Sequence, residues 1–251
     1  MGTSKSYTSS LKGQPQWGQL SSSMTRNCIG GKIPQKSISG ILSNYSGVVQ
    51  GSKRSGSGGG SNYRIGKSAV KAAQGLGGFF NSISSGGEGR NLQEVLREYG
   101  LDDLSGKTVS EIVNFLLEKI NGVSSTKDDS AAKEATKKIL AEFADQANSI
   151  DELEENLSKK LEIESIEEIL IKYYGYYIHE DLSRMFYEKL VKEKGKSNCN
   201  GLFREIKDYI MSRLTRLNKE GKLKKIDFSS DKWKNLIKDI YDRVIKIFGD
   251  E

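Results

Sequence analysis

The chain has 251 residues, enough for one large domain or two small ones, and 29% of them are charged. Its two cysteines, Cys28 and Cys199, lie far apart and belong to no CxxC pair, which excludes a disulfide framework and favours a reducing compartment. There is no run of 18 apolar residues and no apolar h-region at the N-terminus. We therefore expect neither a membrane span nor a secretory signal.

Charge and glycine divide the chain into parts. Residues 1–90 carry 11 Lys and Arg with a single acidic residue, Glu88, whereas residues 91–251 have a net charge of −4. Nineteen of the 27 glycines also precede residue 91. We predict a flexible, basic, Gly/Ser-rich tail over 1–64, a Gly/Ala-rich helix or hinge over 65–90, and a helical domain over 91–251.

The first seven residues have the composition of a tail that can thread into a narrow pocket. Removal of Met1 leaves a glycine amine, which titrates near ~8 and has no side chain to hinder it. Small or flexible residues follow, and an aromatic residue ends the stretch. Another interpretation is an ordinary poorly ordered chain end. We predict Gly2 as a modification site, with a partner contacting Thr3, Ser4, Ser6 and Tyr7.

Residues 8–64 have the composition of a linker, with a run of glycine and serine over 56–61. Three short apolar islands interrupt it, centred on Trp17, Ile38 and Tyr45. Each is too short to bury a core alone. Two interpretations stay open: they anchor on a partner or on the helical domain, or they are sticky disordered segments.

Helical periodicity begins at residue 65 and dominates from residue 91, and no segment alternates with period two. Over 65–85, Gly75, Gly77 and Gly78 indicate either a close contact between helices or a hinge. The remainder predicts an all-α domain of about seven helices, the last two forming a hairpin near Gly221. The expected helices begin at Asn91, Thr108, Asp129 or Ser130, Ser149, Ser165, Leu202 and Ser230.

Two tyrosine pairs flank Gly175 on the longest predicted helix, which runs from Ile166 to about residue 194. Tyrosines carry much of the binding energy of protein interfaces, so we predict Tyr173 and Tyr177 as partner-binding residues. The alternative is that the cluster packs in the core with one wet edge.

Several chemical motifs are incomplete. Gly66-Lys67-Ser68 resembles the end of a phosphate-binding loop, but the required glycine is replaced by Ser61 and no strand precedes it. His179, the only histidine, lacks an HExxH pattern. The acidic pairs at 102–103 and 128–129 are typical of helix starts rather than a catalytic dyad. We therefore predict no catalytic residue, no metal site and no cofactor, and a protein that is not an enzyme.

The basic N-terminal third also suggests a nucleic-acid-binding or scaffold module without modification. Its cations are spread over 90 residues without an arginine cluster, so we expect only non-specific nucleic-acid contacts. Gly2 and Ser6 also fit the myristoylation pattern, but one acyl chain gives only marginal membrane binding. We expect no membrane partner.

The start Met1-Gly2-Thr3-Ser4-Lys5-Ser6-Tyr7 resembles the MGTS-x-SY start of QatB proteins, the B component of the bacterial four-gene Qat anti-phage defence system. A second similarity covers about residues 65–145. It includes Gly77-Gly78-Phe79-Phe80, the run from Leu96 to Lys107 and the alanine-rich stretch from Asp129 to Phe143. The chain departs from the family in its linker, which has few prolines.

The resemblance implies a cytoplasmic bacterial protein without catalysis of its own. Its partners would be an enzyme similar to QueC from the same operon and also the system's ATPase and TatD-like nuclease. QueC-type chemistry activates a deazaguanine carboxylate with ATP and lets an amine attack it. The resemblance therefore implies that Gly2 is conjugated to a 7-deazaguanine and that the helical domain docks the QueC-like enzyme.

Overall fold

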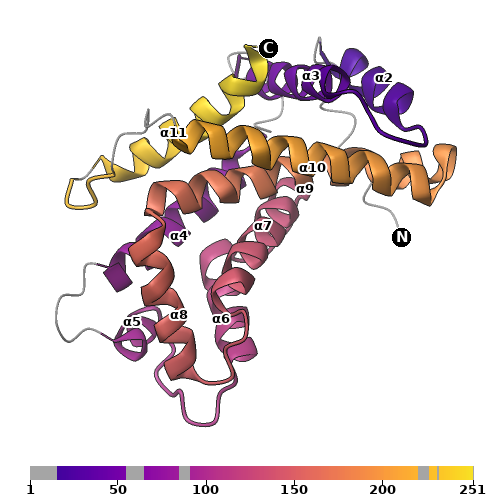
Figure 1. The fold of residues 1–251 in the computed structure, drawn as a ribbon. Coiled ribbons are helices and arrows are strands. Elements are labelled where there is room, and N and C mark those ends of the chain that lie inside the picture. The colour runs from indigo at the N-terminus through magenta and orange to yellow at the C-terminus, as the bar shows by residue number, and fades with distance from the viewer. Residues whose placement is uncertain (1–15, 55–64, 85–90, 220–225, 231, 251) are drawn as a thin grey trace.

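The computed structural model describes residues 16–54, 65–84, 91–219, 226–230 and 232–250, and these contain ten helices and no strand (Figure 1). None of the described helices is both long and apolar enough to cross a lipid bilayer. The helices are α2 (Trp17–Asn27), α3 (Gln35–Arg54), α4 (Lys67–Ser84), α5 (Leu92–Glu98), α6 (Val109–Asn121), α7 (Lys127–Phe143), α8 (Ile150–Ile163), α9 (Ile166–Lys194), α10 (Lys196–Lys219) and α11 (Trp233–Gly249).

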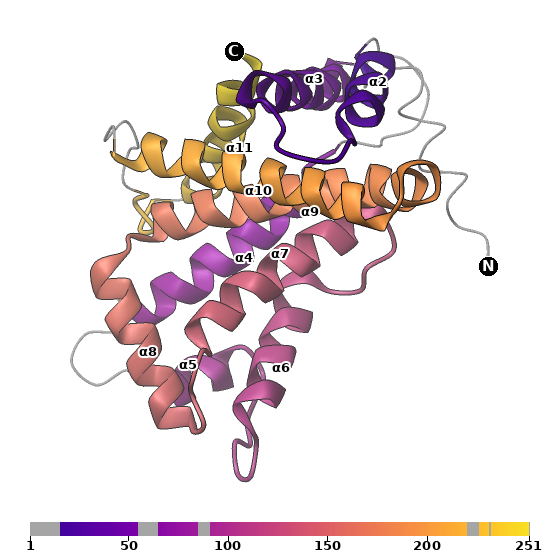
Figure 2. The same ribbon diagram turned by 45° about the vertical axis from the view of Figure 1, so that its right-hand side comes forward.

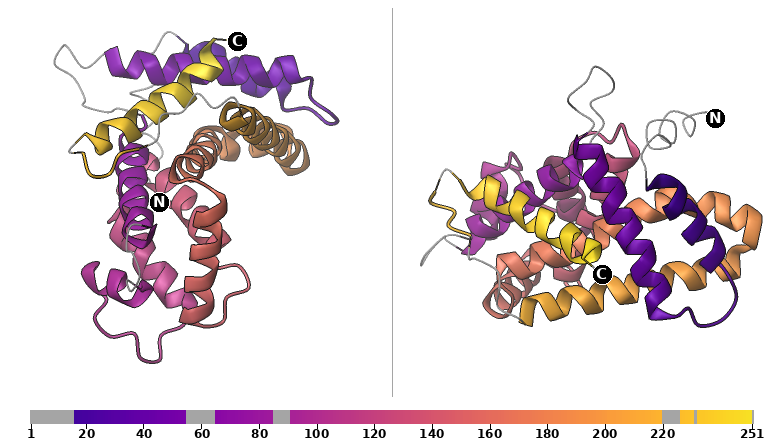
Figure 3. Two further views of the ribbon diagram at one scale, coloured as in Figure 1. Left: turned by 60° about the vertical axis from the view of Figure 1, so that its left-hand side comes forward. Right: turned by 90° about the horizontal axis from the view of Figure 1, so that it is seen from above.

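The long helix α9 lies at the centre of the molecule and packs against α7, α10, α4 and α11. The pair α9 and α10 forms a middle layer (Figure 1, Figure 2). On one side lie α2, α3 and α11, and on the other the remaining helices extend away from the pair. Figure 3 shows α3 beside the C-terminal part of α11. The core therefore runs through all three layers around α9.

The N-terminal third differs from the prediction. Residues 17–54 form two helices rather than an irregular tail, while residues 1–15 and 55–64 lie outside the described part of the chain. The apolar islands of α3 are buried and follow a helical spacing of three and four residues. Their burial against α11 and α10 outweighs the poor helix propensity of the intervening glycines and serines. The docking interpretation of these islands is confirmed for Ile38, Ile41, Leu42, Tyr45, Val48 and Val49.

The glycines of α4 make close contacts between helices within a continuous helix. A Cβ atom on Gly77 would lie 2.9 Å from the Ile237 side chain, and one on Gly75 would lie 3.0 Å from Ile120. Neighbouring helices approach so closely that only glycine fits without displacing a side chain. The close-contact interpretation is therefore confirmed over 67–84, and residues 85–90 are not described.

Among the described residues, seven helices follow residue 91, as predicted, and several begin at the predicted caps. The Thr108–Glu111 and Ser165–Glu168 pairs form complete capping boxes, and Gly195 ends α9. However, α7 begins earlier than predicted, because Thr126 is its cap and Asp129 completes the box. Another difference is that α10 already starts at Lys196.

The predicted hairpin of the last two helices is wrong. The main neighbour of α10 is α9, and α11 packs against α3, α9 and α4. The apolar face of α11 is therefore covered by α9 and α4 and also by α3, which lies in the segment predicted to be an irregular tail. The residues around Gly221, where the turn was predicted, lie outside the described part of the chain.

Candidate functional site

Most of the predicted site residues precede the first described residue. Gly2, Thr3, Ser4, Ser6 and Tyr7 all lie within residues 1–15. The described chain starts at residue 16, and the Trp17 ring stacks on the Phe186 ring of α9 with centroids 5.3 Å apart. The first described helix is therefore attached to α9 by an aromatic contact at its first residue.

A buried hydrogen bond attaches α3 to the same helix. The Tyr45 hydroxyl donates to Asp181 Oδ2 at 2.8 Å, and both residues are fully buried. The neighbouring Ser46 hydroxyl donates to the carbonyl oxygen of Ile245 in α11 at 2.8 Å. A buried carboxylate is costly unless it is hydrogen-bonded, so the Tyr45–Asp181 pair fixes the position of α3 on α9.

The two predicted partner-binding tyrosines require a correction. Tyr173 and Tyr177 are both 0% exposed, and burial holds the pKa of each phenol well above its ordinary value. Their side chains lie in the core between α9 and its neighbours, so they present no surface to a partner. Tyr174 is buried as well, and only Tyr176 of the four tyrosines is partly exposed. The alternative interpretation therefore describes this cluster: it packs in the core, and only Tyr176 is partly exposed to solvent.

The Tyr177 hydroxyl instead donates to Asp128 Oδ1 in the core. The same carboxylate accepts the backbone N–H of Gly66 at 3.1 Å and that of Ser68 at 2.9 Å. It thus lies at the N-terminus of α4, where unpaired N–H groups and the helix dipole favour an anion. Gly66 has a φ of +88°, and a Cβ there would lie 2.0 Å from the Tyr241 hydroxyl oxygen.

These contacts explain the segment that resembles a phosphate-binding loop. The N–H groups that would hold a phosphate are occupied by an internal carboxylate. Asp128 also lies in the first turn of α7, so the N-termini of two helices surround its charge. The helix-start interpretation of the pair at 128–129 is therefore confirmed, with the addition that Asp128 joins α4, α7 and α9.

Asp129 adds a second link between α7 and α4, beside the contacts of Asp128, and we call these contacts together the Asp128 junction. Its Oδ1 accepts the Ser68 hydroxyl at 2.7 Å, and its Oδ2 accepts the backbone N–H groups of Ser125 and Thr126. Partial burial would raise the pKa of this carboxyl. The hydrogen bonds from Ser68, Thr126 and Ser125 outweigh burial and lower the pKa of Asp129 to about 2. The Asp129 carboxylate is consequently ionised at neutral pH, and in this form it accepts the hydrogen bonds that join α4 to α7.

His179 takes part in a second polar group on α9. Its Nδ1 lies 3.2 Å from Glu180 Oε1, and its Nε2 lies 3.2 Å from the carbonyl oxygen of Phe203 in α10. Lys138 of α7 also pairs with Glu180. Burial would raise the pKa of Glu180, but its bonds to His179 and Lys138 lower it to about 2. Within the described residues, no group of three or more His, Cys, Asp or Glu side chains is placed to hold a metal ion.

The two cysteines meet although they are far apart in sequence. Cys28, after α2, and Cys199, in α10, are both buried and free, and each thiol influences the pKa of the other, while Cys199 Sγ donates to the Tyr187 carbonyl oxygen at 3.7 Å. Burial, together with this neighbour, raises the pKa of the Cys199 thiol to about 11. Burial also raises the pKa of Cys28. Both remain thiols at neutral pH, which is typical of packing residues rather than nucleophiles.

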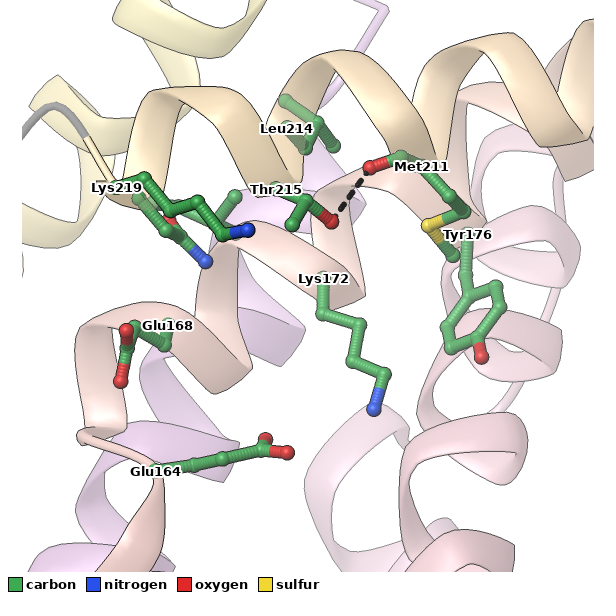
Figure 4. A pocket seen from close by; sticks show the side chains of 10 residues that line it. Glu164, Glu168, Lys172, Tyr176, Met211, Leu214, Thr215 and Lys219 are labelled. Carbon is green, nitrogen blue, oxygen red and sulfur yellow. Dashed lines mark hydrogen bonds between the residues drawn. The ribbon is translucent and has the colours of Figure 1, made fainter.

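A groove between α9 and α10 is the clearest surface feature with mixed chemistry (Figure 4). It encloses ≈ 390 Å³ and lies near the turn that joins α8 to α9. In Figure 4, α10 contributes Met211, Leu214, Thr215 and Lys219 above, and Glu164 and Glu168 lie on the opposite side. The groove thus combines an apolar floor with charged walls, which is a common character of binding sites. Its lining comprises Glu164, Glu168, Ile171, Lys172, Tyr176, Met211, Leu214, Thr215, Asn218 and Lys219.

Close packing on one side of the groove fixes its floor. A Cβ atom on Gly175 would lie 2.8 Å from the Leu214 side chain and 3.1 Å from Met211 Sδ, so glycine lets α10 approach α9 here. The Tyr176 hydroxyl donates to Glu142 Oε1 at 2.7 Å, and Lys172 pairs with the same carboxylate. Partial burial and this bond raise the pKa of Tyr176. In the sequence, Gly175 between the tyrosine pairs is the one sign that another helix packs closely here, although it does not by itself indicate a groove.

A comparison with protein families decides the identity. The family described as Qat anti-phage system associated protein QatB matches residues 56–248. The chain belongs to the QatB family. It is therefore a component of the Qat anti-phage system. No curated protein and no solved structure matches the chain.

The range matched to QatB includes the Asp128 junction and all residues of the groove. It excludes α2, α3 and the first seven residues. In this QatB protein, the parts on either side of that boundary are joined by Tyr45–Asp181 and Trp17–Phe186. The family match therefore does not include the start motif, and the similarity of that motif to other QatB proteins depends only on residues 1–7.

Proposed function

We propose that this protein is the adaptor and the substrate of a QueC-like enzyme in the Qat system. Its α-amino group at Gly2, after removal of Met1, is conjugated to a 7-deazaguanine. Membership of the QatB family together with the Met1–Tyr7 motif is the observation that carries this proposal. The folded helices supply the docking surface, and the chemistry belongs to the partner.

The proposed reaction needs an unhindered neutral amine. ATP activates the carboxylate of the deazaguanine, the amine nitrogen attacks the activated carbonyl carbon, and an amide forms as the activating group and a proton leave. A glycine α-amino group titrates near ~8, so a useful fraction is neutral at physiological pH, whereas a lysine titrates near ~10.4. Gly2 is consequently a better nucleophile at this pH than the side chain of Lys5.

The position of Trp17 limits how far the Gly2 amine can lie from the folded helices, which supports its role as a substrate for a docked enzyme. Residues before Gln16 number 15, and a chain of this length spans at most about 50 Å when extended. Trp17 ties the base of this segment to Phe186. A partner docked on the helices would thus find the amine within a limited radius, which raises its effective concentration.

Co-expression with the QueC-like enzyme tests the proposal. We expect the intact mass of the purified protein to increase by one deazaguanine acyl group when the partner is active, and not when its ATP site is inactivated. Gly2→Val should abolish the adduct because the branched side chain crowds the amine, while the circular dichroism of the helices stays unchanged. An unmodified protein in the presence of an active partner would contradict the proposal.

A further inference from the structure

The fold brings positive side chains from separate segments to one end of the molecule. Arg26 lies in the last turn of α2, Lys194 ends α9 and Lys196 begins α10, and all three are exposed. Arg26 and Lys194 line one depression of ≈ 530 Å³ beside α2. The loop after α2 lies against α10, because a Cβ atom on Gly30 would be 3.4 Å from Asn198 Oδ1. Figure 1 shows α2 next to the turn between α9 and α10.

The positive charge at this end is not balanced by neighbouring acidic groups. We call four exposed side chains the cationic end: Arg26, Lys32, Lys194 and Lys196. Within the described residues, none of the four forms a salt bridge, and the two glutamates near the end of α9, Glu188 and Glu193, each pair with another lysine of that helix. Residues 16–54 contain no acidic residue at all. The cationic end is therefore free to attract an anion.

Helix stability accounts for only part of this charge. Cations are favourable at helix C-termini, where Arg26 and Lys194 lie. Lys196, however, is the first residue of α10, whose first turn has no acidic residue, and there the helix dipole favours an anion. Lys32 lies in the loop between α2 and α3 and stabilises neither helix end. A bound anion would thus complement both the lysines and the start of α10.

Negative charge gathers at the opposite end of α9. Residues 145–168, which include α8 and the start of α9, contain nine acidic residues and two lysines. Glu168, in the first turn of α9, precedes Lys194 by 26 residues, which corresponds to about 39 Å along the helix. A large polyanion is consequently attracted to the cationic end and repelled by the far end, which orients the molecule towards it.

From these observations we propose that the cationic end binds the phosphate backbone of double-stranded DNA. Small and hydroxyl-bearing residues line the depression between Arg26 and Lys194, and they let a phosphate approach closely and donate hydrogen bonds to its oxygens. These residues are Gly18, Ser21, Ser22 and Thr25. The contacts read phosphates rather than base edges, so the binding carries no sequence preference.

The same surface suits other partners less well. No described aromatic residue is exposed, and the Trp17 ring at the depression is already stacked on Phe186, so no platform is present here for the bases of a single strand. Of the described large apolar side chains, Ile29 is the one exposed at this end. Protein interfaces usually depend on a cluster of apolar anchors, which one isoleucine does not provide. A duplex, which needs only cations and donors, is the better match.

Fluorescence anisotropy of a labelled DNA duplex of mixed sequence, titrated with the full chain, tests the proposal. Four phosphate contacts predict that the affinity falls about 100-fold between about 50 and 200 mM salt. Lys194→Gln combined with Lys196→Gln removes two of the contacts. This double variant should bind about tenfold more weakly at about 50 mM salt and should halve the slope of log affinity against log salt.

Lys119→Gln combined with Lys137→Gln is the matched control. It removes the same net charge from two exposed lysines of α6 and α7 and should leave both the affinity and the slope close to those of the unsubstituted chain. Equal losses in the two double variants, no duplex binding at low salt, or tighter binding to a single strand would overturn the proposal. Self-association that only Lys194→Gln with Lys196→Gln abolishes, without duplex binding, would assign the surface to a second copy instead. No QueC-like enzyme is present, so the outcome is independent of whether Gly2 is conjugated.

Discussion

At the scale of single residues, two neighbouring aspartates show how this protein tolerates buried charge. Asp128 accepts two N–H groups from the start of α4 and the hydroxyl of Tyr177, and it lies in the first turn of α7. The partial positive charge of two helix N-termini replaces the cation that a buried carboxylate usually needs. The sequence indicates a helix start at this position. It gives no sign of the contact with Gly66, which lies 62 residues earlier.

Replacement of Asp128 by alanine should be strongly destabilising. The change leaves two N–H groups and a buried phenol without acceptors, so we expect a loss of about 3 kcal/mol or more in the free energy of unfolding. Chemical denaturation monitored by circular dichroism measures this loss. Asp102→Ala, at an exposed position, is the control and should change stability by less than about 0.5 kcal/mol. Equal stabilities of the two variants would contradict the role assigned to Asp128.

Stability should also fall in acid. The folded-state pKa values of Asp129 and Glu180 are about 2, below their ordinary values of 3.8 and 4.5. Both groups therefore stabilise the fold above about pH 4.5, and this contribution is lost as the pH decreases towards 2. Thermal unfolding followed between pH 6 and 2 should show the decrease. Asp129→Asn should flatten the pH dependence, and an unchanged slope in this variant would argue against the assignment.

At the scale of elements, the sequence predicted some helices well and others poorly for identifiable reasons. Local capping signals, such as Thr108 with Glu111, place the helices after residue 91 because both partners are close in sequence. In contrast, α2 and α3 consist largely of weak helix formers, and their stability comes from burial against distant helices. The groove between α9 and α10 was likewise missed, because it depends on how two helices diverge.

The attachment of α3 offers a test at this scale. Tyr45→Phe removes the buried donor to Asp181, and we expect it to cost about 1–3 kcal/mol in unfolding free energy. Hydrogen exchange should increase most in α2 and α3, because this bond fixes them to α9. Tyr187→Phe is the matched control, since its hydroxyl bonds Asn200 at an exposed site. A uniform increase in exchange across all helices would show that Tyr45 acts globally instead.

At the scale of the whole molecule, the chain combines a helical body with an N-terminal segment of opposite charge to part of that body. Residues 145–168 are strongly acidic, whereas the first 15 residues carry only positive side-chain charge. The range matched to QatB proteins covers most of the body. In the proposed function, the helical body docks the partner and the amine of Gly2 undergoes the covalent chemistry.

The position of the adduct tests this account most directly. Tandem mass spectrometry of the N-terminal peptide, after co-expression with the active QueC-like enzyme, distinguishes the Gly2 nitrogen from the side-chain nitrogen of Lys5. We predict a deazaguanine acyl group on Gly2 in most molecules and none on Lys5. A peptide that begins with an unmodified Gly2, or one that carries the group only on Lys5, would contradict the account.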